Sequence, residues 1–342
     1  MAYISFKPSD YFNTLLYTGT GSSNAVTGVG FRPDFVWIKG RDFTDNHNLY
    51  DIVRGVEKRI TSNGSGVQED RPAGLTAFGS DGFTVNTANG ENKSSAPIVA
   101  WNWRAGNAQG SSNTDGSINT TYTSVNTTAG FSISQYTGTA STATVGHGLG
   151  AVPSVVLTKN LSVDYNWQMY HIGLTSANYR IALDQTDAEG GDSTAFNNTA
   201  PTSSVFSVGT SPRTNGNGNS IIAYCFAEKK GFSKFGSYKG NGSTWGPFVN
   251  CGFKPAWILF KRTESANGWI LMDNKRPTVN SISYGSNPQN TLLEAQSNAA
   301  EASSTSYHVN FLSNGFKIRN TNNVFNNTSG SYIYLAFAEH PL

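Results

Sequence analysis

The stretch Gly252-Phe-Lys-Pro255-Ala-Trp257-Ile-Leu-Phe260-Lys261 decides the fold, because a close relative of it occurs twice more in the chain. In every copy a lysine follows the proline by six residues, with a mostly apolar run between them. The other copies are Gly30-Phe-Arg-Pro33-Asp-Phe-Val-Trp-Ile-Lys39 and Val152-Pro153-Ser-Val-Val-Leu-Thr-Lys159. A run that is apolar at successive positions predicts a β-strand that is buried on both faces. Proline lacks an N–H and therefore marks the start of such a strand.

The residues around this motif also repeat. A Tyr-x-Gly turn precedes the proline by 16 or 17 residues, and its tyrosine is Tyr17, Tyr136 or Tyr238. Each copy closes with an aromatic-rich strand, which we place at 98–103, 221–228 and 332–339. A threefold recurrence over most of a chain is typical of tandem structural units.

Glycine and asparagine between the short apolar runs supply the turns of an antiparallel fold. The sequence therefore predicts an all-β protein of three tandem antiparallel β-sandwich modules of jelly-roll type. We place an N-terminal arm and the first module in residues 1–105, and a linker in residues 106–129, which are rich in Ser, Asn, Thr and Gly. The second and third modules occupy residues 130–230 and 231–342. One short helix is expected at residues 291–302.

Composition excludes several classes of protein. The 342 residues include 24 Lys and Arg against 22 Asp and Glu, a formal charge of +2. A protein that binds nucleic acid through its phosphates usually has a strong basic excess, so we expect no nucleic-acid partner. No apolar run approaches the ~20 residues that span a bilayer, so we expect no membrane insertion. No secretory signal is visible at the start of the chain, so we expect synthesis in a cytosol.

Motifs for catalysis or metal binding are not found. The two cysteines, Cys225 and Cys251, are expected to be buried and reduced, and the five histidines lack a metal-binding spacing. The acidic run Asp184–Asp192 does not match a calcium-binding loop. We therefore expect neither a metal nor a cofactor, and no enzyme activity. The repeated Lys39, Lys159 and Lys261 are interpreted as solvated charges at strand ends.

Three segments resemble a known group of proteins. They are Gly130-Phe-Ser-Ile-Ser-Gln-Tyr-Thr-Gly-Thr139 with the following Gly146-His-Gly-Leu-Gly150, the junction from Phe226 to Gly240, and the opening Phe6-Lys-Pro-Ser-Asp-Tyr-Phe12. These are similar to the tandem repeats of tail fibres and other virion structural proteins of tailed bacteriophages, of the marine and cyanobacterial phage type. The resemblance covers nearly the whole chain and assigns no catalytic residue.

The resemblance implies a non-enzymatic virion structural protein that is made in the host cytoplasm, most simply a tail fibre or attachment protein. Tandem modules would then bind host-surface glycan polyvalently. Expected partners are other virion proteins, a host cell-surface glycan and further copies of the chain in a homotrimer. Two alternatives stay open: a capsid decoration or head-fibre protein that clamps the shell, and a polysaccharide depolymerase, whose carboxylate pair has no sequence signature.

Candidate binding residues are sought outside the repeated strands, because binding usually resides in loops on a rigid scaffold. We interpret six aromatic residues as not repeated: Tyr50, Trp167, Tyr170, Tyr179, Trp245 and Trp269. We select the segment 160–205, which combines aromatic residues with the acidic run. Its candidate binding residues are Trp167, Tyr170, Tyr179, Asp187, Glu189 and Asp192.

Overall fold

A computed structural model of the chain describes residues 7–277 and 288–340. Residues 1–6, which open the expected N-terminal arm, lie outside this description. Strands hold 41% of the residues and helices 5%, and all the named strands pair antiparallel. The prediction of an all-β fold is confirmed. We call residues 8–105 repeat 1, residues 106–230 repeat 2 and residues 231–340 repeat 3.

Repeat 1 consists of a large sheet and a small one. The large sheet has the order β1-β9-β3-β4-β5-β6 and contains β1 (Phe12–Thr18), β3 (Phe35–Gly40), β4 (Asn48–Asp51), β5 (Lys58–Thr61), β6 (Glu69–Asp70) and β9 (Pro97–Trp103). The small sheet has the order β2-β8-β7 and contains β2 (Asn24–Thr27), β7 (Leu75–Gly79) and β8 (Gly82–Val85).

Repeats 2 and 3 have the same order of central strands in the large sheet and differ at its edges and in the small sheet. The large sheet of repeat 2, β10-β11-β18-β13-β14, contains β10 (Thr120–Asn126), β11 (Phe131–Thr137), β13 (Val155–Asn160), β14 (Gln168–His171) and β18 (Ser220–Phe226). Its two-stranded pairs are β12 (Ala143–Gly146) with β17 (Val205–Val208) and β15 (Tyr179–Arg180) with β16 (Gly190–Gly191). The large sheet of repeat 3, β19-β28-β21-β22-β24-β25, contains β19 (Ser233–Lys239), β21 (Trp257–Arg262), β22 (Ile270–Asp273), β24 (Thr291–Glu294), β25 (Ala302–Ser303) and β28 (Ser331–Phe337). Its small sheet, β20-β27-β26-β23, contains β20 (Phe248–Asn250), β23 (Pro288–Gln289), β26 (Val309–Leu312) and β27 (Gly315–Ile318).

Helices are short. A four-residue helix precedes the closing strand of each repeat: α1 (Asn89–Asn92), α2 (Pro212–Asn215) and α3 (Asn323–Asn326). Two 3₁₀ turns complete the described helices, η1 (Pro8–Asp10) and η3 (Thr305–Tyr307). The helix expected at 291–302 is wrong, because β24 and β25 occupy this segment and pair with each other.

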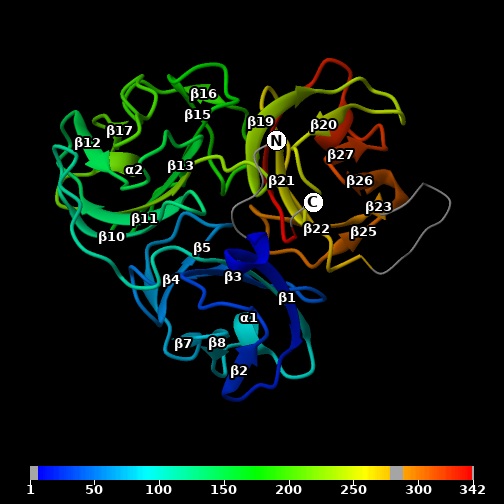
Figure 1. Ribbon diagram of the computed structural model, residues 1–342, viewed down its shortest axis with the longest axis horizontal. Coiled ribbons are helices and arrows are strands. Elements are labelled where there is room, and N and C mark those ends of the chain that lie inside the picture. The colour runs from blue at the N-terminus through cyan, green and yellow to red at the C-terminus, as the bar shows by residue number, and fades with distance from the viewer. Residues whose placement is uncertain (1–6, 278–287, 341–342) are drawn as a thin grey trace.

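The three repeats surround a common centre, with the large sheets facing inward and the small sheets at the rim (Figure 1). Strand β3 shows why its sequence is apolar throughout. Val36 and Ile38 pack in the core of repeat 1, between its two sheets. Phe35 and Trp37 point the other way, into a core that all three repeats share. The predicted burial on both faces is confirmed, and the second face is covered by the neighbouring repeats.

Backbone hydrogen bonds join the repeats in a cycle. The N–H of Glu301 in repeat 3 donates to the carbonyl of Arg41 in repeat 1, 2.7 Å away. The equivalent bonds run from Gln68 to Leu161, at 3.2 Å, and from Glu189 to Thr263, at 2.7 Å. Each acceptor lies two residues after the repeated lysine. Every repeat therefore contacts both of the others through the same surfaces. One hydrophobic cluster contains residues of all three repeats, and each repeat also has a cluster of its own.

The repeated lysines differ from the expectation. Lys39, Lys159 and Lys261 are fully buried, not solvated. Each Nζ donates to backbone carbonyls, which include Asn298 of repeat 3 for Lys39 and Ser65 of repeat 1 for Lys159. Burial lowers the pKa of all three to about 8. The lysines are buried because the neighbouring repeat covers the end of the strand.

The expected linker is also corrected. Within 106–129, residues Thr120–Asn126 form β10, which pairs along β11 and extends the large sheet of repeat 2. Ser111 forms an isolated bridge with Thr123 on the same strand. The segment is polar because β10 is an edge strand, and its β-branched residues favour an extended backbone.

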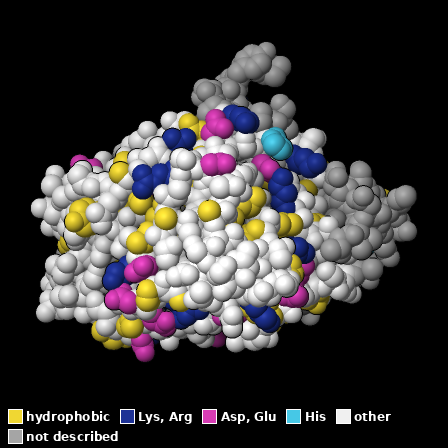
Figure 2. Space-filling model, turned by 90° about the horizontal axis from the view of Figure 1, so that it is seen from below, with side chains coloured by type: hydrophobic (Ala, Val, Ile, Leu, Met, Phe, Trp, Pro, Cys, Tyr) yellow, Lys and Arg dark blue, Asp and Glu magenta, His cyan; other side chains and the backbone are white. Residues whose placement is uncertain are grey.

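Much of the face seen in Figure 2 is neither charged nor hydrophobic, in keeping with a chain of only 13% charged residues. Among the described residues, no helix is long and apolar enough to cross a membrane.

Candidate functional site

One set of hydrogen bonds recurs in all three repeats and fixes the loop after the first repeated strand. A buried asparagine ends the short helix: Asn92, Asn215 and Asn326. Its Oδ1 accepts a bond of 2.8 Å from the backbone N–H of Thr20, Thr139 or Asn241. Its Nδ2 donates to the carbonyl of Ser22, Ser141 or Ser243. We call this arrangement the asparagine clamp.

The repeated tyrosines support the clamp. The hydroxyls of Tyr17, Tyr136 and Tyr238 donate to the carbonyl of the residue before the clamp asparagine, at 2.5 to 2.9 Å. The asparagine lies five residues before the closing strand in every repeat, and this constant spacing is the signal in the sequence by which the clamp can be found. The clamped loops are therefore held at both ends by hydrogen bonds to a buried asparagine.

In repeat 3 the clamped loop carries an exposed tryptophan. Trp245 is 69% exposed, whereas the other six tryptophans of the chain are at most 4% exposed. Asn241 Nδ2 donates to the carbonyl of Trp245 at 3.1 Å, and the N–H of Trp245 donates to Ser243 Oγ at 3.1 Å. Asn241 Oδ1 in turn accepts from the N–H of Ser243. The loop is therefore ordered before any ligand arrives.

Two cations lie beside this indole. Arg319 Cζ is 4.2 Å from the ring centroid and Lys317 Nζ is 5.7 Å from it. Phe248 is 44% exposed and pairs in register with Lys317 across β20 and β27. We call Trp245, Phe248, Lys317 and Arg319 the Trp245 platform. It combines an apolar ring surface with positive charge, as sites for ligands with flat apolar faces and polar groups require.

The tryptophan and one tyrosine selected from the sequence are not at a surface. Trp167 is fully buried in the shared core, and its Nε1 donates to the carbonyl of Thr61 in repeat 1 at 2.9 Å. Tyr170 is 4% exposed and packs against Phe196 inside repeat 2. The prediction that these two residues contact a ligand is wrong, because both contribute to cores.

The other selected residues lie around the short pair β15 and β16. Glu189 accepts two bonds from Thr175, at 2.8 and 2.9 Å, and Asp192 lies 3.5 Å from the guanidinium of Arg180. Tyr179 is half-buried and Asp187 is exposed. The structure thus brings the acidic residues into one loop, where Glu189 and Asp192 hold that loop in place. Ligand binding by this loop stays a prediction.

A signal in the sequence separates these aromatic residues. Trp167 and Trp269 each follow the repeated lysine by eight residues, so they do repeat. Trp269 is fully buried as well, and its Nε1 donates to Ala182 of repeat 2 at 2.8 Å. Trp245 has no such equivalent, since Ala143 and Asn24 lie at the corresponding distance from the repeated tyrosine.

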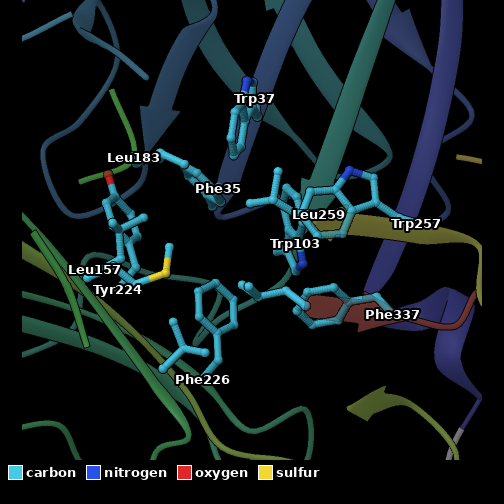
Figure 3. A pocket seen from close by; sticks show the side chains of 13 residues that line it. Phe35, Trp37, Trp103, Leu157, Leu183, Tyr224, Phe226, Trp257, Leu259 and Phe337 are labelled. Carbon is cyan, nitrogen blue, oxygen red and sulfur yellow. The ribbon is translucent and has the colours of Figure 1, made fainter. Parts of the chain in front are cut away.

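Figure 3 shows a cavity at the centre of the molecule, lined by aromatic and aliphatic side chains of all three repeats, Phe35, Tyr224 and Trp257 among them. Its volume is about 30 Å³. Pockets that hold small molecules are roughly ten times larger or more. This cavity is therefore a packing defect on the axis of the repeats and offers no room for a substrate.

The described residues contain no group of three His, Cys, Asp or Glu side chains that could hold a metal ion. Cys225 and Cys251 are free and buried, and burial raises the pKa of both thiols, that of Cys251 to about 12. Neither thiol is therefore activated as a nucleophile.

Comparisons with known proteins add one finding. No curated protein matches the chain. A family model described as a domain of unknown function (DUF7483) matches residues 7–341, which include all three repeats. Because this match spans nearly the whole chain, the chain belongs to the DUF7483 family.

Proposed function

We propose that this protein is a non-enzymatic structural protein of a bacteriophage particle, a tail fibre or attachment protein that binds host-surface glycan. The observation that carries the proposal is the exposure of Trp245. The free energy falls when a large aromatic side chain is transferred out of water. Such residues are enriched where proteins bind partners. The C–H face of a sugar ring is a surface of matching shape and polarity for an indole.

The scaffold supports the same proposal. The clamp and the bonds of Asn241 order the Trp245 loop in the free protein. A site that is already ordered loses less conformational entropy when it binds. Weak contacts of the kind that one sugar ring makes are then sufficient for measurable affinity.

The number of platforms per chain refines the proposal. Only repeat 3 carries an exposed tryptophan, so we expect one platform per chain, not three. Avidity then comes from several copies of the chain on one particle, in a homotrimer or in a larger array with other virion proteins. The three repeats of one chain are arranged around a common centre. This arrangement contributes to stability, because it builds the shared core.

A glycan array tests the proposal. The purified chain is biotinylated, displayed on fluorescent streptavidin beads and incubated with printed bacterial surface polysaccharides. We expect a subset of the polysaccharides to retain beads, and Trp245→Ala to abolish that retention. Ile172→Ala is the matched control, because Ile172 is 54% exposed on repeat 2 and lies outside the platform.

Two results would contradict the proposal. If no polysaccharide retains the wild-type beads, glycan attachment fails and the shell-clamping alternative becomes the better explanation. If Trp245→Ala beads bind as the wild type does, the platform is not the site. Released oligosaccharide in the supernatant would show a depolymerase instead.

A further inference from the structure

The two cations of the Trp245 platform share one face of the sheet. Lys317 and Arg319 are two positions apart on and just beyond β27, so their side chains point to the same side of the strand. Both lie over the ring of Trp245. The guanidinium and the ammonium therefore lie close to the indole ring, while Trp245 stays 69% exposed to water.

Neither cation has a carboxylate partner among the residues that the structure describes. This is unusual for the chain, because most of its arginines are paired: Arg41, Arg54, Arg59, Arg71, Arg180, Arg262 and Arg276 each lie within 4.0 Å of a carboxylate oxygen. The platform therefore carries two positive charges that the described part of the protein leaves unneutralised. A ligand with negative charge would supply the missing partner.

We propose that the ligand of the Trp245 platform is an acidic polysaccharide, with a sugar ring on the Trp245 indole and a sugar carboxylate paired with Arg319 and Lys317. This inference rests on the proposed glycan-binding function and names the class of glycan. The planar guanidinium donates two parallel bonds to a carboxylate, which gives Arg319 the specific contact. Lys317 adds charge without that geometry.

A single-stranded nucleic acid is the competing polyanion, since it also combines bases with negative charge. Proteins that bind it use a basic groove and several stacking side chains in succession. The platform offers one exposed indole and two cations, and the whole chain has a formal charge of only +2. These observations favour the acidic polysaccharide.

The test uses the full chain, displayed at equal density on a biosensor, and four defined polymers: polygalacturonate, neutral dextran, dextran sulfate and oligo(dT). We expect polygalacturonate to bind at least tenfold more tightly than dextran at low salt, and to weaken as salt is added. Arg319→Gln is expected to reduce that affinity by on the order of tenfold. The affinity of Arg319→Lys for polygalacturonate should lie between those of the wild type and Arg319→Gln, because lysine keeps the charge and lacks the planar guanidinium.

Lys93→Gln is the matched control. Lys93 is an exposed lysine whose Nζ lies 4.4 Å from the ring centroid of Phe43 in repeat 1, so the substitution removes the same kind of contact elsewhere. It should leave polygalacturonate binding unchanged. Arg319 is half-buried, so circular dichroism melting of each variant is needed to exclude unfolding as the cause of a loss.

The outcomes separate this inference from the function on which it rests. If dextran and polygalacturonate bind equally well and Trp245→Ala abolishes both, the proposal of an acidic ligand is wrong. The proposed glycan binding is then still supported. If dextran sulfate binds and polygalacturonate does not, the proposal that the ligand's charged group is a carboxylate is wrong. Tighter binding of oligo(dT) than of any polysaccharide overturns both. Unchanged polygalacturonate affinity in Arg319→Gln also overturns the inference, whatever Trp245→Ala does.

Discussion

The hydroxyl of Tyr224 in repeat 2 donates a hydrogen bond of 2.7 Å to the buried carboxylate of Asp51 in repeat 1. The same relationship joins repeat 1 to repeat 3, where Trp101 Nε1 donates to Asp273 at 2.9 Å. Each aspartate also forms a buried ion pair with an arginine three residues later. Two of the three interfaces between repeats thus use a buried aspartate as their polar anchor.

Removal of the Tyr224 hydroxyl should destabilise the whole molecule. Tyr224→Phe leaves Asp51 paired with Arg54 but one bond short in a buried site, so we expect the free energy of unfolding to fall by about 1–2 kcal/mol. Urea denaturation followed by tryptophan fluorescence measures this. Tyr179→Phe, which removes a hydroxyl from a half-buried position, is the control and should change little. Equal losses in the two variants would contradict the role of the anchor.

The third interface has a histidine where the other two have an aspartate. His171 Nδ1 accepts from the N–H of Gly173 at 2.9 Å, so Nε2 carries the proton that is donated to the carbonyl of Tyr334 in repeat 3. Burial lowers the pKa of His171 to about 4, well below the ordinary value of 6.5. The folded state therefore binds fewer protons than the unfolded state between pH 6.5 and 4, and His171 makes stability fall as the pH falls through that window.

His171→Gln should flatten this dependence, because the amide keeps one donor and one acceptor and does not titrate. We expect the difference in stability between pH 6.5 and 4.5 to shrink relative to the wild type, by up to on the order of 3 kcal/mol. Urea denaturation at both values measures it. His340→Gln, at an exposed histidine, is the control. A slope that His171→Gln leaves unchanged would mean that other groups set the acid sensitivity.

The buried lysines are expected to be essential for stability. Lys159→Met removes the donor from the carbonyls of Ser65, Asn160 and Tyr165, which lie 2.9 to 3.0 Å from Nζ. Because carbonyls left unpaired in a buried site are costly, the loss should be at least about 3 kcal/mol. Lys58→Met, which breaks a surface pair with Asp70, should cost less than about 1 kcal/mol. Thermal melting of the two variants side by side distinguishes the cases, and similar melting temperatures would refute the prediction.

The asparagine clamp allows stability and binding to be separated. Asn326→Ala and Asn215→Ala each remove one acceptor and two donors from an equivalent buried site, so both should lower the free energy of unfolding by about 2–3 kcal/mol. Only Asn326 holds the loop that carries Trp245. We therefore expect Asn326→Ala, and not Asn215→Ala, to weaken polygalacturonate binding at a temperature where both remain folded. Equal binding by the two variants would show that the clamp does not preorganise the platform.

Fluorescence quenching measures the charge of the platform without any ligand. Trp245 is the exposed tryptophan, so collisional quenchers reach it first. The nearby Arg319 and Lys317 should concentrate anions, so we expect iodide to quench Trp245 more efficiently than caesium at equal ionic strength. Trp245→Phe should remove most of the quenchable emission. Stronger quenching by caesium would contradict a positive platform.

The repeated motif made the fold predictable to a large extent. Val36, Trp37 and their equivalents are apolar on both faces of the strand, and this pattern alone indicated burial on both sides. What covers the second face was not predictable, because the contacts between repeats join segments that are far apart in the sequence, from 94 residues for Lys159 and Ser65 to 259 residues for Lys39 and Asn298. The buried Lys39 and its equivalents follow from the same contact, since nothing in a local window shows that another repeat covers the strand end.

The binding residues were predicted less well, for a different reason. Trp167 and Trp245 are the same residue type in similar polar surroundings in the sequence. They are distinguished by alignment of the repeats, in which Trp167 has an equivalent in Trp269 and Trp245 has none. A tryptophan that repeats marks the core of this protein, and the unmatched tryptophan lies at the surface.

Because of the shared core, the three repeats form a closed ring in which the last repeat packs against the first. Phe12 in the first strand stacks on Phe337 in the last, with ring centroids 5.5 Å apart, and Phe232 contacts both Tyr11 and the N–H of Ala338. Repeat 3 and repeat 1 are not consecutive in the chain, but they pack against each other. We expect a circular permutant that joins repeat 3 to repeat 1 through a flexible linker, and opens the chain between repeats 2 and 3, to keep the interfaces described above. The packing of the shared core therefore does not depend on which of the three repeats comes first in the chain.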